Sequence, residues 1–362
     1  MSPATILTEQ AKRRWLRLTP DRIVFLLLAA EGILFLSEHF HWFAFNEKKG
    51  WTVLIAVASV GLAMLLLLVG LAASIIFCWR FQFGIRSLLV MVLVAAIPCG
   101  WLGVEIKKAK RIEAAVQAIG KHGGTVLYDY EISWPSGVST PGAEPDGSKF
   151  LRQLIGHDFF NRLVFVDFHP KSDGELLAVG ELTDLRILAL RYSRISDMGL
   201  ECLKGLIHLQ CLEIVQTEFT GTGLIHLKGL KELRNMVLSG SSFNDAGMAS
   251  LAELTHIDNL HLDSTAISDT GLVHLKALPE LKYLDLGHTE VTDAGLQCLK
   301  EMTQLNGIAL YETSIGDAGL EQLRGLFRLE YLLVTQTKVT EDGVKALQQA
   351  LPTCNIRQYE YK

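Results

Sequence analysis

A glycine recurs every 24 residues through the C-terminal half of this 362-residue chain. In each copy it is followed by Leu, Met or Val, and a column of leucines lies four residues after it. The seven glycines are Gly199, Gly223, Gly247, Gly271, Gly295, Gly319 and Gly343. A constant period of this length predicts a stacked array of repeats, because no short unit can bury its apolar face alone.

The content of one repeat can be seen in residues 281–296. Leu284 and Leu286 alternate with other residues, which is typical of a short strand whose leucines turn inward. Thr292 then occupies a helix N-cap position, and Gly295 opens a short helical stripe of leucines. With a degenerate eighth copy near Val164, the sequence predicts seven to eight strand–helix coils stacked into a parallel sheet.

This unit resembles the leucine-rich repeat, whose pattern is L-x-x-L-x-L-x-x-N/C-x-L. The resemblance covers about residues 160–351 and implies an α/β solenoid. It is similar to the ribonuclease-inhibitor-like, cysteine-containing subclass. It is also similar to bacterial repeat proteins that join an N-terminal membrane span to such an array.

The chain departs from that pattern at the Asn/Cys position, which is a hydroxyl in every copy. The residues are Ser193, Thr217, Ser241, Thr265, Thr289, Thr313 and Thr337. A buried hydroxyl offers fewer hydrogen bonds than an Asn amide. We expect a ladder in which each hydroxyl bonds the backbone of the neighbouring coil.

The first 106 residues predict an all-α membrane anchor. Residues 51–79 and 87–104 contain no charged residue, and crossing a bilayer takes about 20 apolar residues. A third stretch is apolar but contains Glu31, whose carboxylate offsets much of the insertion free energy. We therefore expect two or three transmembrane helices, at about residues 23–45, 51–79 and 85–104.

The side of the membrane that carries the repeats depends on the number of spans. Counting Lys and Arg favours two spans, because 11 of these residues then lie on the cytoplasmic side and 2 on the other. Hydropathy slightly favours three, which places the repeats on the opposite side. We expect three, and hence an integral protein of the plasma membrane with its repeats outside the cytoplasm, the arrangement that the similar bacterial proteins imply.

Charge divides the chain close to the end of this anchor. Residues 1–111 carry 13 basic and 6 acidic side chains, and residues 112–362 carry 21 and 33. An acidic C-terminal part argues against nucleic-acid binding, which needs clustered positive charge. We interpret residues 107–160 as a connector and N-terminal cap, and residues 161–362 as the repeat domain.

No catalytic motif accompanies the repeats, neither a phosphate-binding glycine loop nor a zinc-protease or serine-hydrolase signature. One helical column alternates possible metal ligands: Cys202, His226, Ser250, His274 and Cys298. Ser250 interrupts it and each half offers two ligands, so we interpret these residues as fillers of half-buried positions. We expect no enzyme, no bound metal and no cofactor.

The positions between and just after the inward leucines, on the concave strand face, are the candidate binding surface. They include Glu213, Asn235, Asn259, His261, Asp263, Tyr283, Asp285, His288, Tyr311, Glu312 and Tyr331. His261 and Asp285 share one phase in neighbouring strands and could pair. Tyrosines among carboxylates and amides are typical of an interface core and favour a partner with basic groups.

The sequence thus predicts a recognition scaffold that is tethered to a lipid bilayer and binds a protein or peptide on its concave face. Two alternatives stay open. One is a structural envelope or surface protein whose arrays self-associate. The other is a substrate adaptor of a ubiquitin ligase, which the repeat subclass suggests only by analogy, since no segment resembles an F-box.

Overall fold

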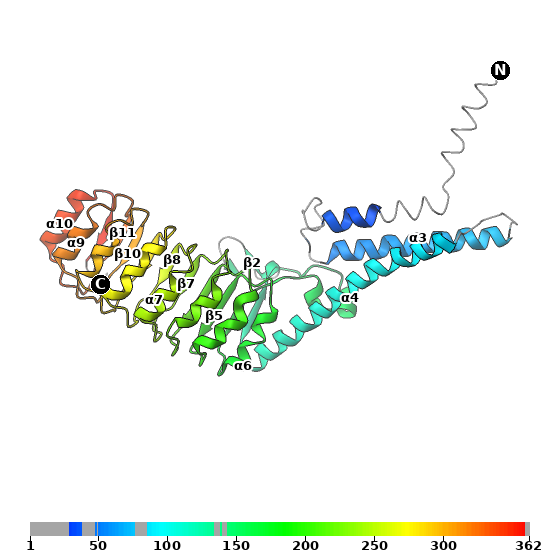
Figure 1. Ribbon diagram of the computed structural model, residues 1–362, viewed down its shortest axis with the longest axis horizontal. Coiled ribbons are helices and arrows are strands. Elements are labelled where there is room, and N and C mark those ends of the chain that lie inside the picture. The colour runs from blue at the N-terminus through cyan, green and yellow to red at the C-terminus, as the bar shows by residue number, and fades with distance from the viewer. Residues whose placement is uncertain are drawn as a thin grey trace, which may run out of the picture. The chain divides into compact units, whose positions relative to one another are not determined.

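The computed structural model describes residues 29–37, 48, 50–76, 85–133, 138–139 and 143–358. The chain forms two compact units, one of residues 1–111 with 144–161 and one of residues 112–143 with 162–362. The division falls inside helix α4, Ile85–Lys121. The second unit contains the repeats, and several of their elements are labelled in Figure 1.

The first unit is helical. Besides the first part of α4, it contains α3 (Trp51–Ile76), α5 (Lys149–Ile155) and the 3₁₀ helix η3 (His157–Phe159). A small apolar core holds these segments together, and its buried members are Val53, Ala109, Phe159 and Phe160. Residues 144–161, which the sequence placed in a connector, therefore pack with the helical unit.

The predicted membrane spans lie only partly within the described residues. Residues 23–28, 38–47 and 77–84 are outside them. In the part of the chain that is described, no helix is both long enough and apolar enough to cross a bilayer. The spans at 23–45, 51–79 and 85–104 thus stay predictions from the sequence.

Among the described residues, the second unit contains a ten-stranded sheet in which β1 is antiparallel to β4 and all later neighbours are parallel. The order in space follows the order in the chain, as successive repeats require. The strands are β1 (Thr125–Tyr128), β4 (Leu163–Phe168), β5 (Ile187–Arg191), β6 (Cys211–Val215), β7 (Asn235–Val237), β8 (Asn259–His261), β9 (Tyr283–Asp285), β10 (Gly307–Ala309), β11 (Tyr331–Leu333) and β12 (Asn355–Arg357). A separate hairpin pairs β2 (Ile132–Ser133) with β3 (Val138–Ser139), and the 3₁₀ helix η2 (Asp129–Glu131) precedes it.

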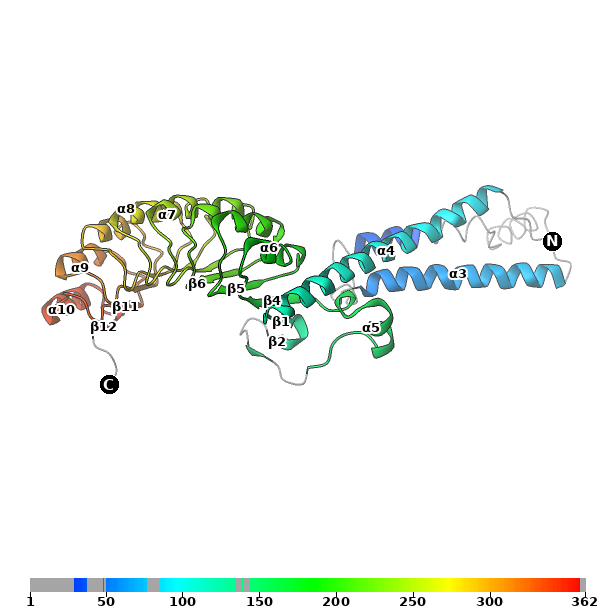
Figure 2. The ribbon, with the colours of Figure 1, turned by 90° about the horizontal axis from the view of Figure 1, so that it is seen from below.

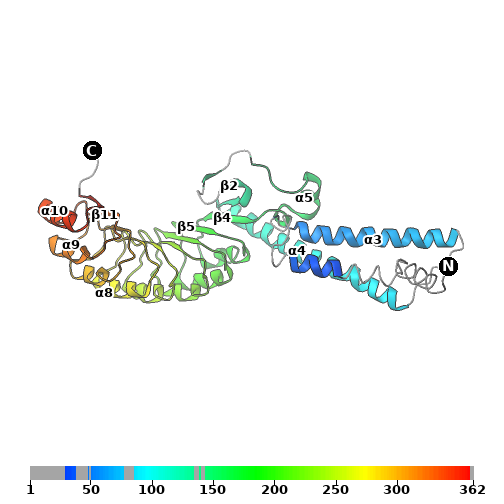
Figure 3. The same cartoon turned by 90° about the horizontal axis from the view of Figure 1, so that it is seen from above.

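Helical segments connect consecutive strands; some are α-helices and the others are short stretches of 3₁₀ helix of three to nine residues. They are α6 (Asp173–Leu176), η4 (Val179–Glu181), η5 (Asp197–Gly205), η6 (Thr222–Leu227), α7 (Asp245–Leu251), α8 (Asp269–Leu272), η7 (Val273–Ala277), η8 (Gly295–Leu299), α9 (Asp317–Leu323) and α10 (Glu341–Ala350). Figures 2 and 3 show that the array curves with its strands on the inner side and these segments on the outer side. The predicted α/β repeat solenoid is confirmed.

The core of the array consists of stacked apolar rows. Leu260, Leu284 and Ile308 are adjacent in the sheet register and fully buried, and both neighbouring coils continue the row. The column of leucines that follows each glycine is buried as well, as Leu275 and Leu299 show. The inward direction predicted for these leucines is therefore confirmed.

An aspartate near the start of most helical segments links its coil to the next one. Asp269 accepts hydrogen bonds from the backbone N–H and the hydroxyl of Thr292, at 2.8 and 2.6 Å. Asp173, Asp245 and Asp317 bond the cap residues of the following coils in the same way. The series is interrupted at Gly221, where a glycine with a φ of +100° replaces the aspartate, and it resumes at Asp245.

This aspartate series explains the glycine column. A Cβ on Gly295 would lie 2.3 Å from Oδ1 of Asp269, and on Gly343 it would lie 2.1 Å from Oδ1 of Asp317. Such distances are far inside van der Waals contact. At five of the seven positions glycine is needed because the carboxylate of the preceding coil fills the space of a side chain; at Gly223 and Gly247 backbone oxygens of the preceding coil lie there instead.

The hydroxyl ladder forms within coils and not between them. Ser241, Thr265 and Thr313 each donate to the carbonyl oxygen three residues earlier, at 2.5–2.6 Å. The expected bond to the neighbouring coil was wrong, because the chain turns directly after the strand and brings its own carbonyl within reach of the hydroxyl.

The aspartates predict a dependence of stability on acid. Burial acts to raise the pKa of Asp245, but hydrogen bonds from Ser268, Thr270 and Gly271 outweigh it and lower that pKa; Asp197 behaves alike. A lowered folded-state pKa adds stability above the unfolded value of about 3.9, which is lost as pH falls through the folded value. Denaturation midpoints should therefore drop progressively as the pH falls below about 5.

Measuring those midpoints for Asp245→Asn should show a shallower dependence on pH than the wild type. Asp342→Asn is the matched control, because the side chain of Asp342 is 94% exposed and bonds only within its own helix. An unchanged slope for Asp245→Asn would show that the series does not govern acid unfolding.

Candidate functional site

The inner side of the sheet presents two outward rows of side chains, set by the parallel register. One row runs through Glu213, Val237, His261 and Asp285. The other runs through Cys211, Asn235, Asn259, Tyr283, Gly307 and Tyr331. The alternation of the sequence therefore assigned these residues to the correct face.

Three of the predicted residues, which we call the central triad, meet where strands β8 and β9 end. His261, Asp263 and Asp285 each offer one nitrogen or oxygen atom, and these atoms all lie within 4.8 Å of one another. Nδ1 of His261 is 3.8 Å from Oδ2 of Asp285, which is too long for a hydrogen bond. The two side chains are neighbours, as the sequence suggested, with a gap between them.

Hydrogen bonds from the scaffold orient both carboxylates of the triad. The backbone N–H of Gly287 donates to Oδ1 of Asp285 at 2.9 Å, and the hydroxyl of Ser239 donates to Oδ1 of Asp263 at 2.5 Å. Tyr311 also hydrogen-bonds to Asp263. Ser239, Asp263, Gly287 and Tyr311 share one 24-residue column, the signal that could have identified Ser239 from sequence.

Two glycines in the sheet make room for the tyrosines. A Cβ on Gly287 would lie 2.1 Å from Cε1 of Tyr311, and a Cβ on Gly307 would lie 2.6 Å from Cδ2 of Tyr283. The rings therefore lie across these glycines. The ring of Tyr283 also contacts that of His261, with centroids 5.0 Å apart.

Both tyrosines adjoining the triad stay neutral near pH 7. Burial raises the pKa of Tyr283 to about 12, with the nearby Asp285 carboxylate as the next cause. Burial also raises the pKa of Tyr311, followed by Asp285 and Asp263. These side chains can donate hydrogen bonds and stack, but they do not supply a phenolate nucleophile.

The remaining predicted residues make other contacts. Glu213 pairs with Arg191 at 2.6 Å, and His288 pairs with Glu312 at 3.0 Å. Asn235 and Asn259 precede Tyr283 in their row. The guanidinium of Arg357 lies 5.6 Å from the ring centre of Tyr331, a contact that sequence reasoning missed.

His288 and Glu312 belong to a column of left-handed backbone at the end of the strands. The column comprises Tyr192, Gln216, Gly240, Ser264, His288, Glu312 and Gln336, with φ between 51° and 63°. A non-glycine residue in this region is uncommon. The backbone N–H of His288 donates to the carbonyl oxygen of Tyr311 in the next coil, so this conformation serves the register between coils.

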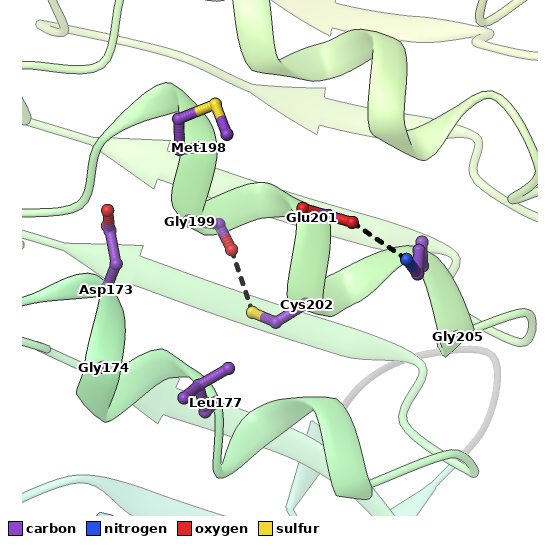
Figure 4. Close-up of a pocket in the computed structure, with 9 residues that line it drawn as sticks. Asp173, Gly174, Leu177, Met198, Gly199, Glu201, Cys202 and Gly205 are labelled. Atoms are coloured by element: carbon purple, nitrogen blue, oxygen red, sulfur yellow. Dashed lines mark hydrogen bonds and ion pairs between the residues drawn. The ribbon is translucent and has the colours of Figure 1, made fainter.

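The helical side carries a separate groove between the first coils, shown in Figure 4. Its volume is about 540 Å³, and Leu177 and Met198 line it with their side chains mostly exposed. Cys202 in this groove donates to the carbonyl oxygen of Gly199, and burial raises its thiol pKa to about 11. A thiol with a raised pKa is a poor nucleophile.

The predicted cysteine–histidine column lies on this helical side. Cys202 and Cys298 both pack against the hydrophobic core of the array. That packing agrees with the interpretation of the column as filler.

Comparison with known proteins concerns the repeats. A family model described as Leucine Rich repeat matches residues 278–300. No curated protein matches the sequence. Among solved structures, an internalin C2 of Listeria monocytogenes is 20% identical over 54% of this chain and 81% of that chain, with a TM-score of 0.45. An internalin F of the same species is 20% identical over 54% of this chain and 59% of that chain, with a TM-score of 0.41.

The family model matches a single coil, residues 278–300, and the other coils of the array have the same geometry. Every coil from β5 to β11 repeats the strand, the turn and the outer segment of the matched one at the same spacing. The C-terminal part of this chain is a leucine-rich repeat domain.

Proposed function

We propose that the inner face of the repeat sheet binds a protein or peptide partner. The observation that carries this proposal is the group formed by Tyr283, Tyr311 and the central triad in the middle of that face. Large, rigid aromatic side chains beside oriented polar groups are typical of the residues that dominate interfaces.

Charge supports a partner with basic groups. The carboxylate of Glu213 on this face is paired with the guanidinium of Arg191 at 2.6 Å. Asp263 and Asp285, by contrast, have no Lys or Arg partner among the ion pairs of the described residues. Complementary charge on a partner would speed association and make binding sensitive to salt.

The membrane tether belongs to this proposal as well. Its support is the pair of uncharged stretches at residues 51–79 and 87–104, together with the basic residues that flank them. We propose that this segment holds the repeat domain at a lipid bilayer, with the repeats outside the cytoplasm. A reporter fused after Lys362 that is active only in the cytoplasm would contradict that orientation.

Replacing Tyr283 and Tyr331 by Ala should weaken binding of the partner by at least about 1–2 kcal/mol. Folding should change little, because both side chains face away from the core and are only half buried. The measurement is a quantitative pull-down from solubilised membranes, with circular dichroism as the test of folding.

Two kinds of control make this experiment specific. Lys228→Ala and Glu301→Ala lie on the helical side and should leave capture unchanged. Gly287→Ala retains every tyrosine but pushes the Tyr311 ring away from Asp263, so it should also weaken capture. Equal capture of the partner by the wild type and by the double tyrosine variant would mean that the partner binds elsewhere on the chain.

A further inference from the structure

The central triad contains negative charge that the surrounding residues do not neutralise. Asp285 is 9% exposed, and its Oδ2 accepts no hydrogen bond from the described residues. Buried charges are normally paired or bound to a metal ion. Glu213, a partly buried carboxylate of the same row of the sheet, has Arg191 as its cationic partner at 2.6 Å, whereas no Lys or Arg pairs with Asp285 among the described residues.

The ligand types and their spacing fit a metal ion. An imidazole nitrogen and two carboxylate oxygens lie within 4.8 Å of one another. Ligand atoms on one Zn²⁺ or Mn²⁺ ion lie about 3–3.5 Å apart, given bond lengths of about 2.1 Å. The 3.8 Å distance between Nδ1 of His261 and Oδ2 of Asp285 is near this value, so small side-chain rotations would bring both atoms within bonding distance of one ion.

We propose that His261, Asp263 and Asp285 bind a divalent transition-metal ion of the Zn²⁺ or Mn²⁺ class. Imidazole combined with carboxylates suits these ions, whereas Mg²⁺ and Ca²⁺ favour shells made of oxygen alone. Three protein ligands leave further positions for water or for a group of a bound molecule.

The residues around the triad provide the support that metal ligands usually have. Metal-bound carboxylates are in turn hydrogen-bonded, and these bonds fix their orientation. Ser239 and Tyr311 bond Asp263, and Gly287 bonds Asp285. Asn259, on the same strand and face as His261, has a buried Oδ1 without a hydrogen-bond partner.

This inference revises the sequence expectation of no metal, which rested on the cysteine–histidine column of the helical side. It does not depend on the proposed recognition function, because an ion can bind whether or not a protein partner exists. Both use the same face, so a bound ion would reduce the attraction of that face for basic groups.

The test is a titration of the full-length chain, freed of metal by a chelator, with Mn²⁺. Electron paramagnetic resonance measures the concentration of free Mn²⁺. Displacement of bound Mn²⁺ by added Zn²⁺ then gives the affinity for Zn²⁺. We expect one site per chain. His261→Gln, Asp263→Asn and Asp285→Asn should each weaken binding at least tenfold, since each removes one of three ligands.

His288→Gln is the matched control, because His288 also faces a carboxylate but is 62% exposed and outside the triad. It should bind Mn²⁺ like the wild type. Thermal unfolding without metal verifies that each variant is folded, and Zn²⁺ should raise the melting temperature of the wild type.

Absence of binding to the wild type would overturn the proposal. So would equal affinity in the wild type and in folded Asp263→Asn, which keeps the size of the side chain. Loss of binding in His288→Gln would point to adventitious surface sites. None of these results involves a protein partner, so they are distinct from a failure of the recognition function.

Discussion

Replacing Leu284 by Ala should lower the free energy of unfolding of the repeat domain by about 2–5 kcal/mol. Leu284 is fully buried and stands between Leu260 and Ile308 in the inward row of the sheet. Because neighbouring strands fix the backbone on both sides, the coil cannot collapse around the cavity. Urea denaturation followed by circular dichroism measures the loss.

Leu177→Ala provides the comparison for this substitution. Leu177 also lies in the repeat domain, but it is 63% exposed on the helical side. Its truncation should change stability by less than about 0.5 kcal/mol. Similar losses for the two variants would mean that the inward rows do not hold the array together.

Replacing Gly295 by Ala should lower the free energy of unfolding by about 1–3 kcal/mol, although it adds a single methyl group. That methyl would lie 2.3 Å from Oδ1 of Asp269 and 3.0 Å from Cδ1 of Leu272. The carboxylate cannot withdraw without breaking its bonds to Thr292. The substitution therefore separates two adjacent coils.

Gly325→Ala is the control, since a Cβ there meets no atom within 4 Å and φ is not positive. A second control removes the Asp269 carboxylate that the added methyl group would meet. In a background that carries Asp269→Ala, Gly295→Ala should destabilise the domain less than it does alone. Strict additivity of the two substitutions would rule out the contact with Asp269 as the cause.

The fold could be predicted because a period of 24 residues repeats the same physical problem in every coil. Leu284 and its equivalents must face the same core, so register and strand direction follow from the pattern. The hydrogen-bond partners of the buried hydroxyls were harder to predict. The sequence shows that Thr265 is buried behind a strand, but which carbonyl it reaches depends on the turn of its own coil.

The candidate site was predictable as a surface but not as a cluster. Alternation places His261 and Asp285 on one face, whereas Asp263 follows its strand, where alternation no longer tells direction. The reach of Tyr311 back to Asp263 depends on the space above Gly287. Such a contact spans two coils and cannot be read from any single repeat.

The interruption of the aspartate series at Gly221 bears on how the array unfolds. There the following coil has no carboxylate link at its cap, and Gly221 instead abuts the ring of Phe243. In a linear array, cooperativity passes only through interfaces between neighbours, so the weakest interface sets the boundary between independent folding blocks. We expect the coils before Gly221 and those after it to exchange their amide protons as two separate groups.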